Sequence, residues 1–192
     1  SYKELEQIEK VKGLPEYLEN AKDWLIISCY TGQRISDFMR FTDEMVRMEE
    51  GKHLLEFTQK KTGKIMTVPL HTKVLELLKK RKGKFPRAIS DQRYNDFIKV
   101  VCEKAKLNAM TAGSIQAETE PESGIFRKEN GIYEKWKLVT SHIGRRSFAT
   151  NFYGNLPTSY LVYITGHSTE AMFRNYIGKS NKDMALEIAK YF

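Results

Sequence analysis

The sequence has 192 residues and a mass of 22.3 kDa, enough to bury one core and less than two full domains usually need, so we expect one domain. Hydrophobic residues make up 41% and charged residues 29%, which excludes collagen-like, low-complexity and largely disordered proteins. The longest apolar runs fall far below the roughly 20 residues that a membrane span needs, so we expect no membrane partner. The chain begins at Ser1 without Met or a signal pattern, and we expect it to be a fragment of a longer protein.

Positive charge is concentrated in the middle of the chain. The net charge is +8; residues 1–50 carry 7 Lys or Arg against 11 Asp or Glu, whereas residues 58–106 carry 14 against 4. A surface this basic attracts polyanions, and a nucleic-acid backbone is the commonest of them. Charge alone leaves two alternatives open, an anionic membrane surface and a solvated basic face without a ligand.

The cysteines and histidines give no metal-binding pattern. Cys29 and Cys102 lie within apolar helical patterns, so we expect buried free thiols in a reducing compartment. The four histidines form no HxxxH or HExxH spacing and the cysteines form no CxxC, so we expect no metal site.

The first half of the chain predicts helices around one hairpin. Leu14-Pro15-Glu16 opens a helix that Gly32 ends, and a short helix is expected near Arg34. Residues 53–58 and 64–68 predict two strands joined by a turn that contains Gly63 and two lysines. Helices are predicted at about 71–82 and 91–106.

The second half predicts a loop, a second hairpin and a helical end. Residues 108–123 lack periodicity and predict a mobile surface loop. Strands at 124–128 and 132–139 are expected around the turn Glu129-Asn130-Gly131. From His142 to Phe192 the chain is predicted to be helical, and Ser180 caps the last helix. The breaks lie at Gly154, Pro157, Gly166 and Gly178. The fold class predicted is α+β, predominantly helical.

Four segments carry residues suited to phosphate chemistry: Thr31-Gly-Gln-Arg34-Ile-Ser-Asp37, the hairpin turn with Lys61, Ser141-His142-Ile-Gly-Arg145-Arg-Ser-Phe-Ala-Thr150, and Gly166-His167 followed nine residues later by Tyr176. In this order and spacing they resemble the tyrosine recombinase (phage integrase) family, from about Trp24 to Tyr176. The resemblance implies the family's catalytic-domain fold with small β-hairpins.

The two arginines also make chemical sense by themselves. A phosphodiester under attack concentrates negative charge on its equatorial oxygens, which guanidinium forks match well. Arg34 and Arg145 are the candidates for this contact. His142 and Arg145 are spaced i, i+3 and so share a helical face. Arg146 projects about 100° away and is expected to contact the DNA backbone or a structural acid.

The resemblance assigns the remaining catalytic roles. It implies that His142 handles a proton at the nucleophile or bonds the phosphate, and that His167 makes a hydrogen bond in the transition state. Lys61 would protonate the leaving oxygen, as a lysine on a flexible turn can. Tyr176 would attack phosphorus and form a 3′-phosphotyrosyl intermediate. Lys60 and Lys64 are the alternatives to Lys61 and are otherwise expected, with Arg146, to bind DNA; Tyr153 and Tyr191 are the alternatives to Tyr176.

The function implied is site-specific DNA recombination by the integrase of a mobile element, through a four-way junction. The resemblance implies double-stranded DNA as the partner, bound by a homo-tetramer that is a monomer or weak oligomer without DNA, with accessory DNA-bending proteins as possible further partners. It implies no metal or nucleotide cofactor. The implied location is the bacterial cytoplasm, in association with the nucleoid. Residues 1–192 would be a catalytic domain whose N-terminal core-binding domain is missing, with an insertion at 108–139. A type IB topoisomerase and a DNA-binding module without the reaction are the rival interpretations.

Three further features of the sequence lead to predictions. Gly144 stands where the family usually has an apolar residue and weakens its helix by about 1 kcal/mol relative to Ala. Asp37 fills the family's acidic position and is expected to orient Arg34. The tail helix of residues 180–192 packs either on its own core or on a neighbouring protomer, and the sequence does not choose between them.

Overall fold

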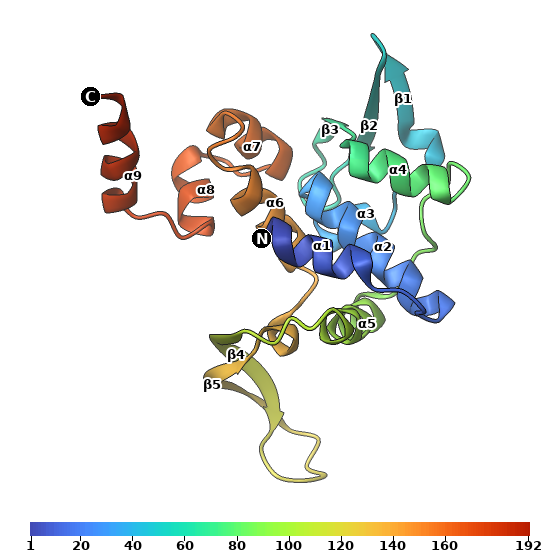
Figure 1. Ribbon diagram of the computed structural model, residues 1–192, viewed down its shortest axis with the longest axis vertical. Helices are drawn as coiled ribbons and strands as arrows, with labels where there is room; N and C mark the ends of the chain where they lie inside the picture. The colour runs from blue at the N-terminus through green and yellow to red at the C-terminus, as the bar shows by residue number, and fades with distance from the viewer.

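Helix α2 (Glu16–Thr31) runs through the middle of the structure, a computed structural model that describes all of residues 1–192 (Figure 1). Every side chain from Asn20 to Thr31 is buried, because helices pack on more than one side of α2. Trp24 lies at its centre and stacks near Phe38 and Phe85. The helix ends at Gly32, whose left-handed backbone turns the chain toward Arg34.

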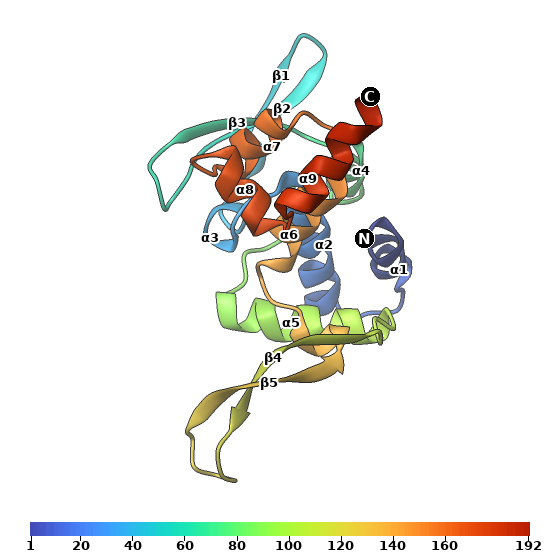
Figure 2. The ribbon, with the colours of Figure 1, turned by 90° about the vertical axis from the view of Figure 1, so that its left-hand side faces the viewer.

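Several helices pack around α2, whereas the C-terminal helix and a long hairpin project from the body (Figures 1 and 2). The other helices are α1 (Tyr2–Lys10), α3 (Ile35–Phe38), α4 (Thr72–Lys80), α5 (Asp91–Lys104), α6 (Ile143–Phe152), α7 (Thr158–Thr165), α8 (Glu170–Tyr176) and α9 (Asn181–Ile188), with short 3-10 turns η1 (Asp43–Met45), η2 (Lys135–Leu138) and η3 (Ala189–Tyr191). The strands are β1 (Val46–Glu49), β2 (Lys52–Thr58), β3 (Ile65–Pro69), β4 (Met110–Glu118) and β5 (Phe126–Glu134).

The predicted fold class, α+β with helices predominant, is confirmed, and so are most of the predicted elements. The helices expected around Pro15, near Arg34, at 71–82, at 91–106 and beyond His142 all form, and Ser180 caps α9 through a reciprocal capping box. Helix α1 and strand β1 were not predicted. No helix has the length and apolar character needed to cross a bilayer.

Strands β1, β2 and β3 form an antiparallel sheet in that order, with β3 at one edge. One face is buried, because Leu55, Phe57, Met66 and Val68 alternate with exposed residues along β2 and β3. The turn between β2 and β3 carries Lys61, as the sequence predicts.

The prediction for residues 108–139 was wrong in its pairing. Residues 110–118, predicted as a loop, form β4, and β5 runs straight through Asn130-Gly131 instead of turning there. The two strands pair over nine residues each, with Gly113 opposite Gly131, and the connection lies at residues 119–125. This arm projects from the body (Figure 1), and none of the residues of its two strands is buried, so the sequence of β4 carries no hydrophobic alternation that marks a strand.

Gly144 allows α6 to cross α2 closely. A Cβ added at Gly144 would lie 1.8 Å from Oγ and 2.6 Å from Cβ of Ser28. The glycine that weakens the helix by propensity is therefore required by packing. This crossing places α6, and Arg145 with it, against the end of α2.

Candidate active site

Arg145 is a buried cation held by neutral groups. Its side chain is buried, with the residue 3% exposed. Nη1 donates to the carbonyl of Gly32 at 3.0 Å and Nη2 donates to the carbonyl of Thr165. No carboxylate forms an ion pair with it, and burial together with the charge of Arg34 lowers its pKa to about 10. A buried charge without a counter-ion is costly, so this position favours an anionic ligand.

Arg34 lies at the start of α3, directly after the turn at Gly32. The turn requires glycine twice over, since its φ is +67° and an added Cβ would lie 2.6 Å from the ring of Phe148. The side chain of Arg34 is half-buried, and its Nη1 is buried without a hydrogen-bond partner. A guanidinium nitrogen in this state is available to an incoming acceptor atom.

Tyr176 is the last residue of α8, and its hydroxyl has no partner. The Oη atom is buried and makes no hydrogen bond. The ring lies 5.0 Å from the ring of His167, centroid to centroid. Burial raises the pKa of the phenol, while the charges of Arg145, Arg146 and Arg34 act against that rise. Burial outweighs these charges, so the resting phenol keeps its proton, and the three cations are placed to stabilise the phenolate that attacks phosphorus.

His167 lies between α7 and α8, after the left-handed Gly166 that ends α7. Its Nδ1 is 2.7 Å from Oγ1 of Thr165. Burial and then the charges of Arg145 and Arg34 lower the pKa of His167 to about 4, so the ring is neutral near pH 7.

Lys61 lies on the exposed turn between β2 and β3, which is fastened to α3. The carboxylate of Asp37 accepts a hydrogen bond from the main-chain N–H of Lys60 at 2.7 Å, and from Nη2 of Arg40 at 3.2 Å. Arg40 also donates to the carbonyl of Thr58 at 2.8 Å. The expectation that Asp37 orients Arg34 was wrong. Its carboxylate bonds the hairpin turn instead, because the fold brings that turn next to α3 although the two are far apart in the sequence.

A second fastening joins the hairpin to α7. The hydroxyl of Tyr163 donates to the carbonyl of Thr67 on edge strand β3 at 3.2 Å, and Lys64 lies over the Tyr163 ring at 5.1 Å. Lys60, Lys61 and Lys64 all lie at or beside the exposed turn.

The other two predicted residues, His142 and Arg146, lie at the start of α6, and their contacts with DNA stay predictions. His142 is the residue before α6, is exposed and makes no side-chain hydrogen bond that caps the helix. Arg146 forms no ion pair with an acid. Its guanidinium lies 5.8 Å from the Tyr176 ring centre and donates to the Tyr176 carbonyl at 3.4 Å. Of its two expected partners the structural acid is therefore absent, because the C-terminal end of α8 occupies that position, and the DNA backbone stays the predicted one.

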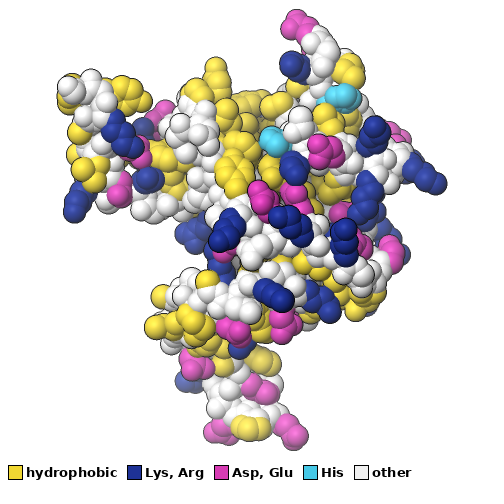
Figure 3. All heavy atoms as spheres, in the orientation of Figure 1, with side chains coloured by type: hydrophobic (Ala, Val, Ile, Leu, Met, Phe, Trp, Pro, Cys, Tyr) yellow, Lys and Arg dark blue, Asp and Glu magenta, His cyan; other side chains and the backbone are white.

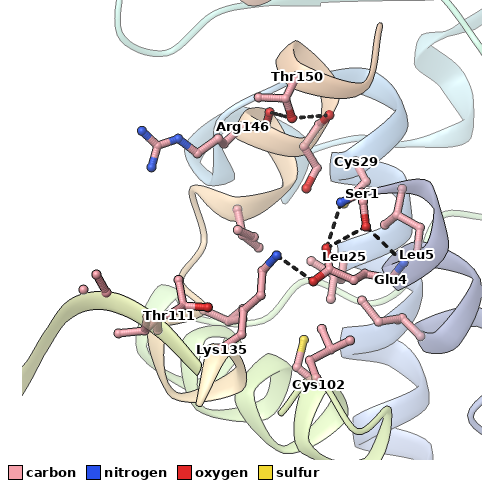
Figure 4. Close-up of a pocket in the computed structure, with 18 of the residues that line it drawn as sticks. Ser1, Glu4, Leu5, Leu25, Cys29, Cys102, Thr111, Lys135, Arg146 and Thr150 are labelled. Atoms are coloured by element: carbon pink, nitrogen blue, oxygen red, sulfur yellow. Dashed lines mark hydrogen bonds and ion pairs between the residues drawn. The ribbon is translucent and has the colours of Figure 1, made fainter. Parts of the chain in front are cut away.

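A cavity of about 460 Å³ lies elsewhere, among α1, α2, α5, β4 and α6 (Figure 4). Glu4 and Lys135 pair across it at 2.6 Å, and the Arg146 guanidinium points away from that pair. Neither Arg34, His167 nor Tyr176 lines this cavity. Cys29 and Cys102 do; both are free, and burial raises the pKa of each thiol to about 12.

Sequence reasoning missed Thr165 and Gln33. Thr165 contacts both Arg145 and His167, and its only sequence signal is its place directly before Gly-His. The amide of Gln33, buried beside Arg34 in sequence, donates to the carbonyls of Thr31 and Ile164 and joins the ends of α2 and α7.

Comparison with known proteins identifies the family. The sequence model described as Phage integrase family matches residues 4–183. The chain belongs to the phage integrase family. A search among curated proteins found no match to this integrase-family chain.

Solved structures of integrases and recombinases share the fold. The chain is similar to the XerH site-specific recombinase bound to palindromic difH substrate, with a TM-score of 0.64 and 15% identity over 99% of this chain and 51% of that one. It is also similar to a lambda integrase dimer bound to a COC′ core site, with a TM-score of 0.57 and 18% identity over 94% of this chain and 58% of that one. A third similar structure is the Tn1549 transposon integrase with transposon right end DNA, with a TM-score of 0.59 and 17% identity over 98% of this chain and 63% of that one. The chain thus spans about half to two thirds of these structures and has the fold of a tyrosine recombinase catalytic domain.

Proposed function

We propose that the protein is a site-specific tyrosine recombinase, the integrase of a mobile element, which cuts and rejoins double-stranded DNA through a 3′-phosphotyrosyl intermediate. One observation carries the proposal. Two guanidinium groups without carboxylate partners, Arg34 and Arg145, lie around the unpartnered hydroxyl of Tyr176. A phosphodiester would supply the missing negative charge and place its phosphorus near the nucleophile.

The residues divide the reaction among them. The oxygen of Tyr176 forms a bond to phosphorus, and the bond from phosphorus to the 5′-oxygen breaks. Arg34 and Arg145 stabilise the charge on the equatorial oxygens. Lys61, on a turn that can enter a DNA groove, protonates the departing 5′-oxygen. The 5′-hydroxyl of a second strand then attacks the phosphotyrosine, releases Tyr176 and completes the exchange.

Apolar side chains of the tail support assembly on DNA. Helix α9 is joined to its own chain at one side, where Tyr153 donates to Glu187 at 2.8 Å and Lys179 pairs with Glu187 at 3.1 Å. Leu186 and Ile188 nevertheless stay at least half exposed. We propose that they pack on neighbouring protomers in a tetramer on DNA, in the bacterial nucleoid.

The charge of the β4–β5 arm favours a protein neighbour over DNA. Its tip, residues 118–123, contains three Glu and no Lys or Arg. Figure 3 shows acidic side chains at this end of the molecule, whereas Lys and Arg gather over the body. A phosphate backbone would repel this tip, so we assign DNA contact to the Lys60–Lys64 turn and leave the arm to contacts between subunits.

A covalent trap tests the proposal. The protein is incubated with fragmented, nicked DNA from its source, and a denaturing gel separates protein–DNA adducts. We expect an adduct from the wild type and from Tyr160→Phe, which alters an exposed tyrosine, and none from Tyr176→Phe. Equal adduct from Tyr176→Phe, or no adduct from the wild type, contradicts the proposal.

The products separate the proposal from a topoisomerase. Two distinguishable duplexes that share the trapped site should yield recombinant strands. Relaxation of one supercoiled duplex without exchange between two would instead favour the type IB topoisomerase.

A further inference from the structure

Thr165 touches two of the residues assigned to the reaction. It is the last residue of α7 and is fully buried. Its carbonyl accepts a hydrogen bond from Arg145, and its hydroxyl oxygen lies 2.7 Å from Nδ1 of His167. The same hydroxyl donates to the carbonyl of Leu161, one turn back, at 2.5 Å.

These contacts determine where the protons lie. A carbonyl oxygen has no hydrogen, so two oxygens 2.5 Å apart require the hydroxyl hydrogen of Thr165 between them. The Thr165 oxygen then offers only lone pairs to the histidine. Its contact with His167 is a hydrogen bond only if Nδ1 of the ring carries a hydrogen.

The tautomer decides what the other ring nitrogen can do. In a neutral imidazole with hydrogen on Nδ1, the Nε2 atom has a lone pair and accepts a hydrogen bond. The charges of Arg145 and Arg34 and the burial of the ring keep His167 neutral near pH 7. Resting His167 therefore offers an acceptor to the site.

The donor available to this acceptor is Tyr176. Its ring lies 5.0 Å from the His167 ring, and its buried hydroxyl, which the charge of Arg145 also reaches, makes no hydrogen bond in the resting site. Of the two guanidinium groups whose charge acts on His167, Arg145 already donates to two carbonyls, and the unpartnered Nη1 of Arg34 is the one assigned to the phosphate. His142, which the resemblance made a candidate for proton handling, is exposed at the start of α6.

We propose that Thr165 is a positioning residue that holds His167 in the Nδ1–H tautomer, so that Nε2 of His167 accepts the proton of Tyr176 when its oxygen attacks phosphorus. The bond from Tyr176 to phosphorus forms, the bond to the 5′-oxygen breaks, the phenolic proton moves to Nε2 and Lys61 protonates the 5′-oxygen. The resulting imidazolium then donates from Nε2 to a phosphate oxygen. This proposal rests on the proposed function for the identity of the nucleophile.

The tautomer can be measured without DNA. Long-range ¹H–¹⁵N NMR of the ¹⁵N-histidine-labelled chain at pH 7 distinguishes a protonated from an unprotonated ring nitrogen, and His167→Gln assigns the signals. We expect a protonated Nδ1 and an unprotonated Nε2 at His167. A wild-type spectrum with the hydrogen on Nε2 overturns the proposal.

Two variants of Thr165 test its part. Thr165→Ser keeps the hydroxyl and should keep the Nδ1–H tautomer, whereas Thr165→Val keeps the shape, loses the hydroxyl and should lose that tautomer. Thr158→Val, at the other end of α7, is the matched control and should leave His167 unchanged. Unchanged signals from His53 and His71 verify the fold. If Thr165→Val fails to fold, the wild-type and Thr165→Ser spectra still show which ring nitrogen of His167 carries the hydrogen.

The rate of adduct formation on nicked DNA tests the catalytic consequence. We expect Thr165→Val to slow it by about 10-fold or more at unchanged DNA affinity, and Thr165→Ser to restore it. An undiminished rate in Thr165→Val overturns the role of Thr165 while the proposed function stands. Absence of any wild-type adduct overturns the proposed function and this catalytic step together, and the tautomer is then judged on its spectrum alone.

Discussion

The carboxylate of Asp37 accepts a hydrogen bond of 2.7 Å from the main-chain N–H of Lys60, 23 residues away. Asp37 lies on α3, the short helix that begins after Arg34, and Lys60 precedes Lys61 on the hairpin turn. One buried carboxylate thus joins the element that positions Arg34, the arginine proposed to bind phosphate, to the turn that carries Lys61, the proposed proton donor.

Removing that carboxylate should loosen the hairpin. Asp37→Ala leaves the Lys60 N–H and Arg40 without their acceptor, and we expect a loss of about 1–3 kcal/mol in the free energy of unfolding, measured by urea denaturation. Cleavage should slow as well, because Lys61 is no longer held. Asp37→Asn keeps one acceptor oxygen and should lose less of both. Full cleavage activity in Asp37→Ala would contradict a role in placing Lys61.

Gly144→Ala separates helix propensity from packing. Propensity alone predicts a gain of about 1 kcal/mol. The new Cβ, however, would lie 1.8 Å from Oγ of Ser28, and such overpacking typically costs 1–3 kcal/mol, so we expect net destabilisation. Thermal and urea unfolding measure the sign. The double variant with Ser28→Gly should recover part of the loss, and a stabilised Gly144→Ala would contradict the close crossing of α2 and α6.

The stability of the protein should depend on His167 in acid. Its pKa of about 4 in the folded chain lies below the ordinary 6.5, so the unfolded chain binds the proton more tightly. This contribution is complete above about pH 6.5 and is lost as the pH falls through about 4. The unfolding free energy of the wild type should therefore fall more steeply over this range than that of His167→Gln. His71, whose pKa is also lowered, is present in both chains and cancels. Parallel curves would contradict the buried environment of His167.

Arg145→Lys tests the guanidinium fork. A lysine retains the charge but lacks the planar fork that spaces the donors between the two carbonyls and the phosphate, so we expect adduct formation to fall by about 10²–10³-fold. Arg47→Lys, in an exposed ion pair with Glu56, is the matched control and should react normally. The amounts of adduct at early times on a gel give the rates. Equal rates for the two variants would exclude Arg145 from the transition state.

The elements that depend on local sequence could be predicted from it. The bounds of α2, the β2–β3 hairpin and the ends of the late helices follow from periodicity, glycine and capping residues, and the family resemblance indicated the six candidate catalytic positions. Periodicity predicts one buried face for α2, whereas helices on more than one side bury all of residues 20–31. The β4–β5 arm was mispredicted because an arm exposed on both faces has no hydrophobic alternation, and Asn130-Gly131 lies within a strand there. The contacts of Asp37 and Thr165 could not be predicted, since each joins segments that only the tertiary fold brings together.

The most direct test of the central claim is to locate the DNA attachment by mass spectrometry. Trypsin cleavage after Arg174 and Lys179 releases residues 175–179, a peptide in which Tyr176 is the only tyrosine. We expect trapped protein to yield this peptide with a nucleotide on Tyr176, joined through a 3′-phosphate. Attachment at Tyr153 or Tyr191 instead, or an unmodified Tyr176 in all of the trapped protein, would contradict it.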